Sequence, residues 1–338
     1  MSDLFEILHT TPNPIVADAF VITNAKLKRY ENISVSISGG SDSDIMLDMT
    51  AKLDTDKYIK YVFFDTGLEY QATKEHLEFL ENKYGIKIDR VKAVKPIPMA
   101  CRQYGQPFIS KRVSNMIKRL QTNNFKWEDE DFDTLYKKYP KCKVALKWWC
   151  NEWPKSKKGY ESQFNINNNK WLKEFMVANP PDFKISDDCC EWAKKKPAHK
   201  YKKEHDIELS MVGVRKAEGG NRTTRYKTCF SEDIKGVAEY RPIFWFKNED
   251  KEAYEETYDV THSKCYSCYG LTRTGCAGCP FGRDFEQELE VIKKYEPKLF
   301  KAVNKIFGDS YEYTRKYREF AERMEAENKS ENTTDKRR

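Results

Sequence analysis

The stretch Ile33-Ser34-Val35-Ser36-Ile37-Ser38-Gly39-Gly40-Ser41-Asp42-Ser43 decides how this chain folds. Its first six residues alternate between apolar and polar side chains, which is typical of a half-buried strand. Two glycines then permit a tight turn, and apolar residues recur at helical spacing over 44–53. The stretch therefore predicts a strand, a glycine turn and a helix, an arrangement in which backbone N–H groups and the helix N-terminus can bind phosphate.

The alternation of strand and helix continues over 58–94. A second apolar run, 58–64, ends at Asp65-Thr66-Gly67-Leu68-Glu69, a helical pattern covers 70–84, and an alternating pattern covers 87–94. This order predicts an α/β fold in which a parallel sheet is covered by helices. Because ligands of such sheets bind outside the carboxyl ends of the strands, we expect the 65–69 segment to lie beside the glycine loop.

Composition excludes several classes of protein. The chain has 338 residues, enough for one large domain or two ordinary ones, and its 14% aromatic residues argue against wholesale disorder. No run of about 18 uncharged apolar residues occurs, and the start MSDLFEILHT lacks a basic segment followed by an apolar one. We therefore expect no membrane segment and a cytoplasmic location. The net charge of +7 permits a nucleic-acid partner without implying one.

The chain divides into parts of different composition. Residues 1–121 are expected to form a nucleotide-binding core, and residues 122–186, which hold five of the seven tryptophans and many lysines, a helical insertion. Residues 187–325 are expected to complete the core with a cysteine-rich part and two C-terminal helices. Residues 326–338 have no apolar periodicity and are predicted to be a disordered tail.

Two motifs resemble those of a known superfamily. Ser38-Gly39-Gly40-Ser41-Asp42-Ser43 matches the signature SGGxDS of the PP-loop ATP pyrophosphatases, and Asp65-Thr66-Gly67-Leu68-Glu69 resembles the DTGxE segment of their phosphoadenosine-phosphosulfate (PAPS) reductase branch. A glycine turn capped by serine and aspartate is the alternative interpretation of the first motif alone. The resemblance implies the adenine nucleotide fold of this superfamily, with ATP bound at both motifs. It also implies Mg²⁺ on the phosphates, with Asp42 or Asp65 as its partner.

Basic residues further along the chain resemble family segments as well. Residues 213–222 resemble GxRxxES…R, except that Gly219 stands where serine is common. The resemblance implies that Arg215 and Arg222 contact phosphate or substrate, and that Lys111 is an additional phosphate contact. Without the resemblance, a solvated surface is the preferred explanation of Arg215 and Arg222.

The ten cysteines favour metal ligation or reactive sulfur, because cytosolic thiols stay reduced. By spacing alone, two CxxC pairs could bind zinc or an iron-sulfur cluster: Cys265, Cys268, Cys276 and Cys279. Only seven residues separate the pairs, however, whereas a usual zinc ribbon has about 15 to 20. Three cysteines match no motif and are expected to be buried, reduced thiols: Cys101, Cys142 and Cys150.

A second interpretation of the cysteines comes from resemblance. The adjacent pair Cys189-Cys190, taken with Cys276 and Cys279, resembles the arrangement that ligates a [4Fe–4S] cluster in adenylylsulfate reductases. We prefer it, because it accounts for two cysteine sites and for the lysines at 194–196, which would offset the negative charge of a thiolate-bound cluster. Zinc is the alternative metal, and Cys229 or Cys265 can replace one member of the adjacent pair.

The resemblance implies three functions. The first is adenylylation of an acceptor by ATP and transfer of sulfur to it, with Asp42, Asp65, Lys111 and Arg215 as catalytic residues and a sulfur-donor or electron-donor protein as partner. The second is reduction of a sulfonucleotide (APS or PAPS); no cysteine follows Cys279, although assimilatory reductases use a cysteine near the C-terminus. The third is a non-catalytic, nucleotide-binding regulatory or defence-associated module.

The acceptor is expected to be a nucleic acid, tRNA or DNA. Between 141 and 173 there are eight lysines interleaved with aromatic residues such as Trp148 and Trp149. Lysines can neutralise phosphates while aromatic rings stack on bases. The alternative is a helical subdomain that buries its aromatic side chains and exposes its lysines.

Overall fold

The computed structural model describes residues 4–335, apart from 156, 158, 160, 163, 220–224 and 233–235. Arg222, which the sequence places among the phosphate contacts, lies outside these described residues. The chain forms two compact units. The sheet unit comprises Met1–Pro96, Trp192–Ala277 and Lys294–Glu296, and the helical unit comprises Ile97–Glu191, Gly278–Lys293 and Pro297–Arg338.

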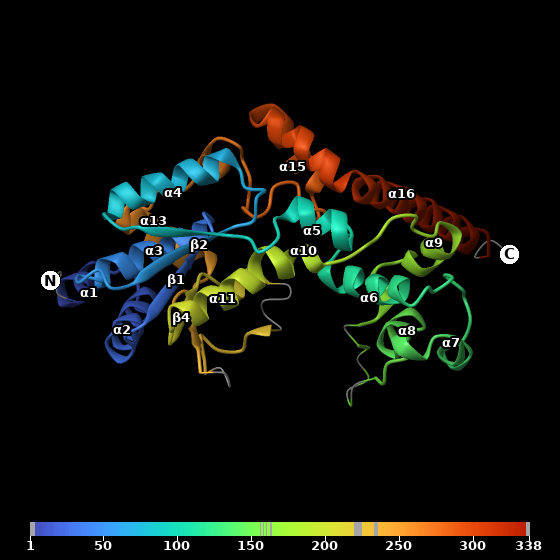
Figure 1. Ribbon diagram of the computed structural model, residues 1–338, viewed down its shortest axis with the longest axis horizontal. Coiled ribbons are helices and arrows are strands. Elements are labelled where there is room, and N and C mark those ends of the chain that lie inside the picture. Colours follow the sequence, from blue (N-terminus) through green and yellow to red (C-terminus); the bar gives the residue numbers. More distant parts are fainter. Residues whose placement is uncertain are drawn as a thin grey trace. The chain divides into compact units, whose positions relative to one another are not determined.

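The sheet unit is built on a six-stranded sheet in the order β3-β2-β1-β4-β6-β5. Strands β2, β1 and β4 of this sheet are labelled in Figure 1. Its strands are β1 (Ile33–Ile37), β2 (Lys60–Asp65), β3 (Ile88–Lys92), β4 (Leu209–Val212), β5 (Phe230–Ser231) and β6 (Ala238–Tyr240). All neighbours pair in parallel except β5 and β6. The predicted α/β fold with a parallel sheet is confirmed, and β5 and β6 were not foreseen.

The strand order changes direction at β1. The chain runs outward from β1 through β2 to β3, whereas β4 returns to the other side of β1, where Ser36 is in register with Val212. In open α/β sheets, ligands bind at such a reversal, outside the carboxyl ends of the strands. The segments that leave β1, β2 and β4 at these ends carry the loop 38–43, the segment 65–69 and Arg215.

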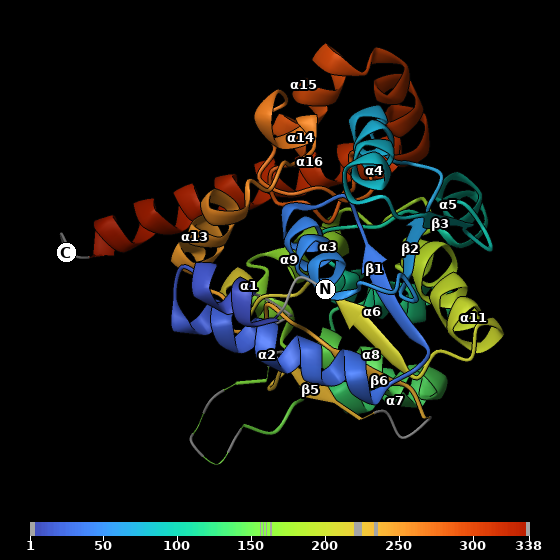
Figure 2. The same cartoon turned by 90° about the vertical axis from the view of Figure 1, so that its left-hand side faces the viewer.

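Helices surround this sheet; some pack on its strands and others pack on those helices. They are α1 (Leu4–Thr10), α2 (Pro14–Arg29), α3 (Ser41–Leu53), α4 (Gln71–Tyr84), α11 (Lys196–Glu204), α13 (Asn248–Tyr258) and α14 (Lys264–Ser267). Helix α3 packs against β1 and α2, and α14 lies against α4 (Figure 2). A core that includes Val35, Leu47 and Met211 joins the sheet to these helices. The loop 38–43 is therefore held between a buried strand and a buried helix.

The segment 122–186, expected to be a helical insertion, lies within the helical unit. The helices of this unit are α5 (Ile97–Tyr104), α6 (Lys111–Thr122), α7 (Phe132–Lys138), α8 (Lys143–Trp149), α9 (Leu172–Ala178), α10 (Asp188–Cys190), α15 (Phe285–Tyr295) and α16 (Pro297–Asp335). Trp148 and Trp149 are 1% and 0% exposed in its core, beside Phe175 and Tyr313. Of the two interpretations of Trp148 and Trp149, the packed helical subdomain agrees with the structure and stacking on nucleic-acid bases does not, because both rings are buried in this core.

The boundaries of the units differ from the expected ones. The helical unit begins at Ile97 and includes α5 and α6, which we had assigned to the nucleotide-binding core, and it also includes α15 and most of the chain after it. The predicted disordered tail is wrong as far as Asp335, because α16 continues to that residue. No glycine or proline interrupts the sequence after Gly308, so nothing in the chain ends the helix earlier. Within the described residues, no helix is long and apolar enough to cross a membrane.

Candidate functional site

The loop 38–43 lies between β1 and α3, with Gly39 in the left-handed region at φ +70°. A Cβ atom on Gly39 would lie 2.6 Å from Cγ2 of Thr73, so only glycine fits there. The Ser43 hydroxyl donates to the Gly40 carbonyl oxygen at 2.7 Å and accepts from the Ser38 amide at 3.2 Å. The two serines therefore hold the loop closed around the N-terminus of α3.

Asp42 lies in the first turn of α3 and is bound by a distant arginine. Arg215 Nε donates to Asp42 Oδ1 at 2.9 Å, and Arg215 Nη1 donates to Asn248 Oδ1 at 3.0 Å. Both side chains of the Asp42–Arg215 pair are nearly buried. The fold thus brings together two predicted site residues that are 173 positions apart, at the start of the helix where an anion would bind.

A lysine that sequence analysis missed also reaches the loop. Lys251 Nζ, from α13, donates to Ser41 Oγ at 2.5 Å and lies 3.5 Å from Asp42 Oδ1. Tyr266 is a second missed residue, whose hydroxyl accepts from the Ser41 amide at 3.0 Å. No motif or spacing in the sequence signals either contact, because both partners come from parts of the chain more than 200 residues away.

The second motif, at the end of β2, is braced by its own hydrogen bonds. Glu69 accepts from the Thr66 amide at 3.0 Å and from the Leu68 amide at 2.9 Å, and Asp65 accepts from the Gly67 amide at 2.8 Å. Burial raises the pKa of Glu69, while the hydrogen bonds from Thr66 oppose that shift. Glu69 therefore shapes this turn, and Asp65 is the carboxylate at the strand end next to the loop.

A buried network of histidines and carboxylates lies behind the loop. His262 Nδ1 is 2.9 Å from Asp44 Oδ2, and His262 Nε2 is 2.7 Å from Glu255 Oε1. His76 Nε2 lies 3.0 Å from the same Asp44 oxygen, and Asp44 is fully buried. Burial acts to lower the pKa of His262, but the hydrogen bonds to Asp44 and Glu255 outweigh it and raise the pKa to about 9. His262 is therefore a charged imidazolium at neutral pH.

This shift predicts that His262 makes folding stability depend on pH. The folded pKa of His262 is about 9, above its ordinary value of 6.5, so its stabilisation is complete below pH 6.5 and is lost as the pH rises through 9. We expect the difference in free energy of unfolding between the native protein and a His262→Gln variant to fall by up to about 3 kcal/mol over this range, less where solvent screens the charge. Urea unfolding at pH 6, 7.5 and 9.5 measures it, and a difference that does not change with pH would contradict the assignment.

Lys111 is not part of the sheet unit. It is the first residue of α6 in the helical unit, is exposed, and follows Ser110, whose hydroxyl caps the helix by accepting from the Val113 amide at 3.2 Å. Its role as a phosphate contact stays a prediction.

The cysteines fall into the two units. Cys276 belongs to the sheet unit, where its sulfur lies 3.7 Å from Thr66 Oγ1, while Cys189, Cys190 and Cys279 belong to the helical unit. In the helical unit, Cys189 on α10 is hydrogen-bonded to Cys101 on α5 and to Cys190. The bond with Cys101 is the largest cause of a raised Cys189 pKa; the bond with Cys190 opposes it, while burial and the nearby Cys101 and Cys279 thiols add to it. Cys101, which matches no motif, is thus a neighbour of the predicted ligands.

The thiols are suitable ligands for an iron-sulfur cluster, although their side chains are not arranged around a metal site. Three cysteines of the helical unit, Cys101, Cys190 and Cys279, interact with Cys189, and thiols are the donor type that a [4Fe–4S] cluster takes. Among the residues that the structure describes, however, no three His, Cys, Asp or Glu side chains are already arranged to hold a metal ion. For the set predicted from spacing alone, Cys265 is buried 3.7 Å from Thr73 Oγ1, whereas Cys268 is exposed.

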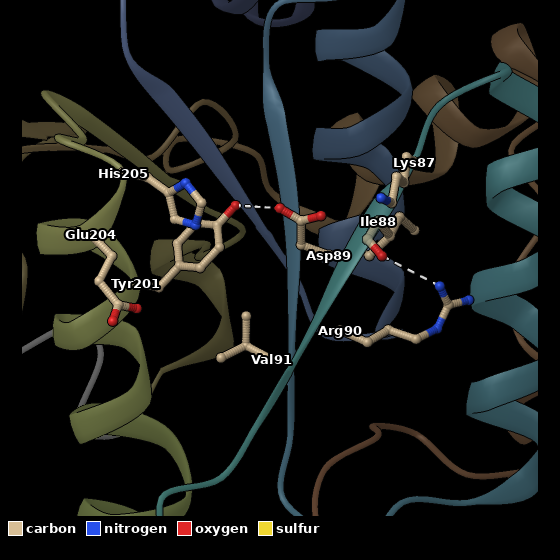
Figure 3. A pocket seen from close by; sticks show the side chains of 8 residues that line it. All are labelled: Lys87, Ile88, Asp89, Arg90, Val91, Tyr201, Glu204 and His205. Atoms are coloured by element: carbon tan, nitrogen blue, oxygen red, sulfur yellow. Dashed lines mark hydrogen bonds between the residues drawn. The ribbon is translucent and has the colours of Figure 1, made fainter.

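A separate pocket of about 550 Å³ opens along the edge strand β3 (Figure 3). It is lined by Lys87, Ile88, Asp89, Arg90, Val91, Tyr201, Glu204 and His205. Its polar groups are partly paired: Tyr201 donates to Asp89 at 2.7 Å, and Arg90 binds Glu81 through two hydrogen bonds of 2.7 and 2.9 Å. The pocket contains none of the predicted site residues, so the loop 38–43 remains the candidate site.

The match to a known family agrees with this site. Residues 32–281, more than half of the chain, match the model of the phosphoadenosine phosphosulfate reductase domain. The chain belongs to this family, and the resemblance to the PAPS reductase branch of the PP-loop superfamily is confirmed. The matched range contains both phosphate motifs and all the cysteines predicted as metal ligands.

More distant similarities are weaker. An uncharacterised protein of Methanocaldococcus jannaschii is 26% identical over 289 residues, covering 85% of this chain and 44% of that protein, so the chain spans less than half the length of its relative. A PAPS reductase from Candida auris has a TM-score of 0.42 at 13% identity, covering 76% of this chain and 87% of the reductase. A U34-tRNA thiolase from Methanococcus maripaludis, solved with its [4Fe–4S] cluster, has a TM-score of 0.37 at 12% identity, covering 90% and 79%. With TM-scores below 0.5, these two likenesses carry no argument about function.

Proposed function

We propose that the chain binds ATP at the loop 38–43 and uses it to adenylylate an acceptor. The observation that carries the proposal is the complete SGGSDS loop at the N-terminus of α3, with Arg215 and Lys251 directly beside it. An acceptor oxygen attacks the α-phosphorus, the bond from that phosphorus to the oxygen bridging the α- and β-phosphates breaks, and pyrophosphate leaves. A sulfide equivalent from a donor protein then attacks the activated carbon, and AMP departs with the former acceptor oxygen.

The roles of the residues follow from their positions. The loop amides and the start of α3 favour the negative charge of the phosphates, and Arg215 adds a fixed positive charge beside Asp42. Asp65 is the carboxylate that we assign to Mg²⁺, an ion that would neutralise charge on the departing pyrophosphate. Asp42 is the alternative partner, although its Oδ1 is already bound by Arg215. Lys111 and Arg222 are proposed as additional phosphate contacts.

We further propose that the protein holds a [4Fe–4S] cluster, with zinc as the alternative metal. Cys189, Cys190, Cys276 and Cys279 stay the proposed ligands, and the contact between Cys101 and Cys189 adds Cys101 as a candidate in place of one of the adjacent pair. A cluster would supply an iron site with affinity for sulfur. The acceptor of sulfur is proposed to be a nucleic acid, recognised through lysines rather than through Trp148 or Trp149, which are buried.

The test is the release of pyrophosphate from ATP by anaerobically purified protein, with tRNA, single-stranded DNA and duplex DNA as acceptors. We expect pyrophosphate from ATP and none from α,β-methylene-ATP, in which carbon replaces the bridging oxygen. A Ser43→Ala variant should be slower by about tenfold, because it loses the hydrogen bonds that close the loop.

Two other outcomes would replace the proposal. Sulfite released from APS or PAPS, without pyrophosphate from ATP, would identify a sulfonucleotide reductase. Tight nucleotide binding with no product from either substrate would identify a non-catalytic nucleotide-binding module with a regulatory or defence-associated role.

A further inference from the structure

The loop 38–43 contains no lysine, although other phosphate loops carry one that reaches the β- and γ-phosphates. In this chain the cation comes from α13. Lys251 Nζ is hydrogen-bonded to Ser41 Oγ, the side chain of the first residue of α3. Lys251 therefore stands at the end of the helix where phosphate is favoured, although it follows Ser41 by 210 residues.

Two hydrogen bonds hold α13, and with it Lys251, in this position. Asn13, the N-cap of α2, donates to Asp250 Oδ1 at 3.0 Å, and Tyr254 donates to Asp48 Oδ2 of α3 at 2.7 Å. These anchors lie just before Lys251 and one turn after it on the same helix. The Lys251 side chain is 17% exposed, so it is largely withdrawn from water but still accessible.

Lys251 has hydrogen-bonding capacity to spare. An ammonium group has three donors; Lys251 Nζ donates to Ser41 and also interacts with Glu255, which leaves at least one N–H donor for a ligand. The nearest carboxylate oxygens, of Asp42 and Glu255, lie 3.5 and 3.6 Å away. A charge-assisted N–H···O bond is typically about 2.7 to 2.9 Å long. Each carboxylate is held more closely by another cation, Asp42 by Arg215 at 2.9 Å and Glu255 by His262 at 2.7 Å.

The positions of the charged side chains also favour the binding of an anion at the loop 38–43. At the start of α3, two cations, Arg215 and Lys251, share the single carboxylate of Asp42. Behind the loop, Asp44 lies beside both His262 and His76, and Glu255 pairs with His262 while also lying 3.6 Å from Lys251. Arg215 and Lys251 therefore place more positive charge beside Asp42 than this single carboxylate neutralises. Partly buried charges are stabilised when they are paired, and a phosphate group would complete the pairing of Lys251.

We propose that Lys251 binds the β- or γ-phosphate of the nucleotide and so replaces the lysine that the loop lacks. The inference rests on the proposed function, because it requires a polyphosphate at the loop. On binding, Lys251 Nζ keeps its bond to Ser41 and directs a remaining N–H donor to a phosphate oxygen, while Arg215 stays on Asp42. Lys251 is thus a binding residue, and Glu255 and His262 position it.

The test measures the affinity of inorganic pyrophosphate with Mg²⁺, and of ATP and adenosine, by titration calorimetry. In a Lys251→Met variant we expect pyrophosphate and ATP to bind about ten- to a hundredfold more weakly, and adenosine as in the native protein. Lys251→Arg should restore most of the affinity because it keeps the charge. Lys264→Met is the matched control, since Lys264 is exposed and pairs with Glu75 rather than with a residue of the loop.

Each outcome decides something. Unchanged pyrophosphate affinity in Lys251→Met would overturn the proposal while leaving the proposed function intact. An equal loss of pyrophosphate and adenosine binding, with a lower unfolding midpoint in the absence of ligand, would mean that Lys251 only supports the fold. If Lys251→Met does not fold, native-like pyrophosphate affinity in Lys251→Gln would overturn the proposal in its place. Failure of the native protein to bind any of the three would refute the proposed function, and this inference with it.

Discussion

Replacing Gly39 by alanine is expected to abolish nucleotide binding. It is also expected to destabilise the sheet unit more than alanine at Gly40, where the nearest atom to an added Cβ lies 3.1 Å away. The Cβ added at Gly39 would lie 2.6 Å from Thr73 Cγ2, and the residue would have to keep φ at +70°. The left-handed conformation alone costs a non-glycine residue about 1 to 2 kcal/mol. The overlap with buried Thr73 adds to this, and relieving it shifts the loop away from the start of α3.

Gly270 offers a matched control for Gly39. It has the same φ of +70°, but a Cβ atom there would have nothing within 4 Å. Gly270→Ala should therefore show the backbone cost alone, and Thr73→Ser in the Gly39→Ala background should recover part of the loss by removing Cγ2. Urea unfolding and ATP titration measure both effects. A Gly39→Ala variant no less stable than Gly270→Ala, with native ATP affinity, would contradict this account of the loop.

Replacing both Cys189 and Cys190 by serine is expected to remove nearly all iron from the protein. Anaerobically prepared native protein should be brown and contain about four iron atoms per chain, as a cubane cluster requires. Loss of the thiolates on α10 leaves too few ligands, so the brown colour, the charge-transfer absorption and the iron content should disappear together. Single Cys276→Ser and Cys279→Ser variants should lose the cluster as well.

Further variants separate the ligand sets. Cys101→Ser loses iron if Cys101 is a ligand and keeps it if the thiol only packs against Cys189. Cys142→Ser is the control, because Cys142 is buried in the core of the helical unit, where its thiol donates to the Tyr139 carbonyl oxygen. Full iron in the Cys189/Cys190 double variant would exclude the adjacent pair, and zinc in place of iron in the native protein would exclude the cluster.

Contacts between residues that are far apart in the chain could not be predicted from the sequence. The tryptophan-rich segment illustrates such a limit. Its composition indicates helices, but it is compatible with Trp148 and Trp149 either on a binding surface or in a core. Only the tertiary core decided between the two, in which the ring of Trp149 lies 5.4 Å from that of Phe125 and 5.8 Å from that of Trp127. The contact between Cys101 and Cys189 was likewise invisible, because α5 and α10 carry no shared motif.

The local sequence by itself determined the strand-turn-helix around Gly39, the parallel order of β1, β2 and β3, and the family, because side-chain period, glycine conformation and motif spacing are properties of neighbouring residues. Tertiary structure alone decided which charges meet at the loop. Arg215 and Lys251 reach Asp42 and Ser41 only because β4 returns beside β1 and because α13 is hydrogen-bonded to α2 and α3. Such contacts depend on the packing of the whole sheet unit, and no sequence window contains both partners.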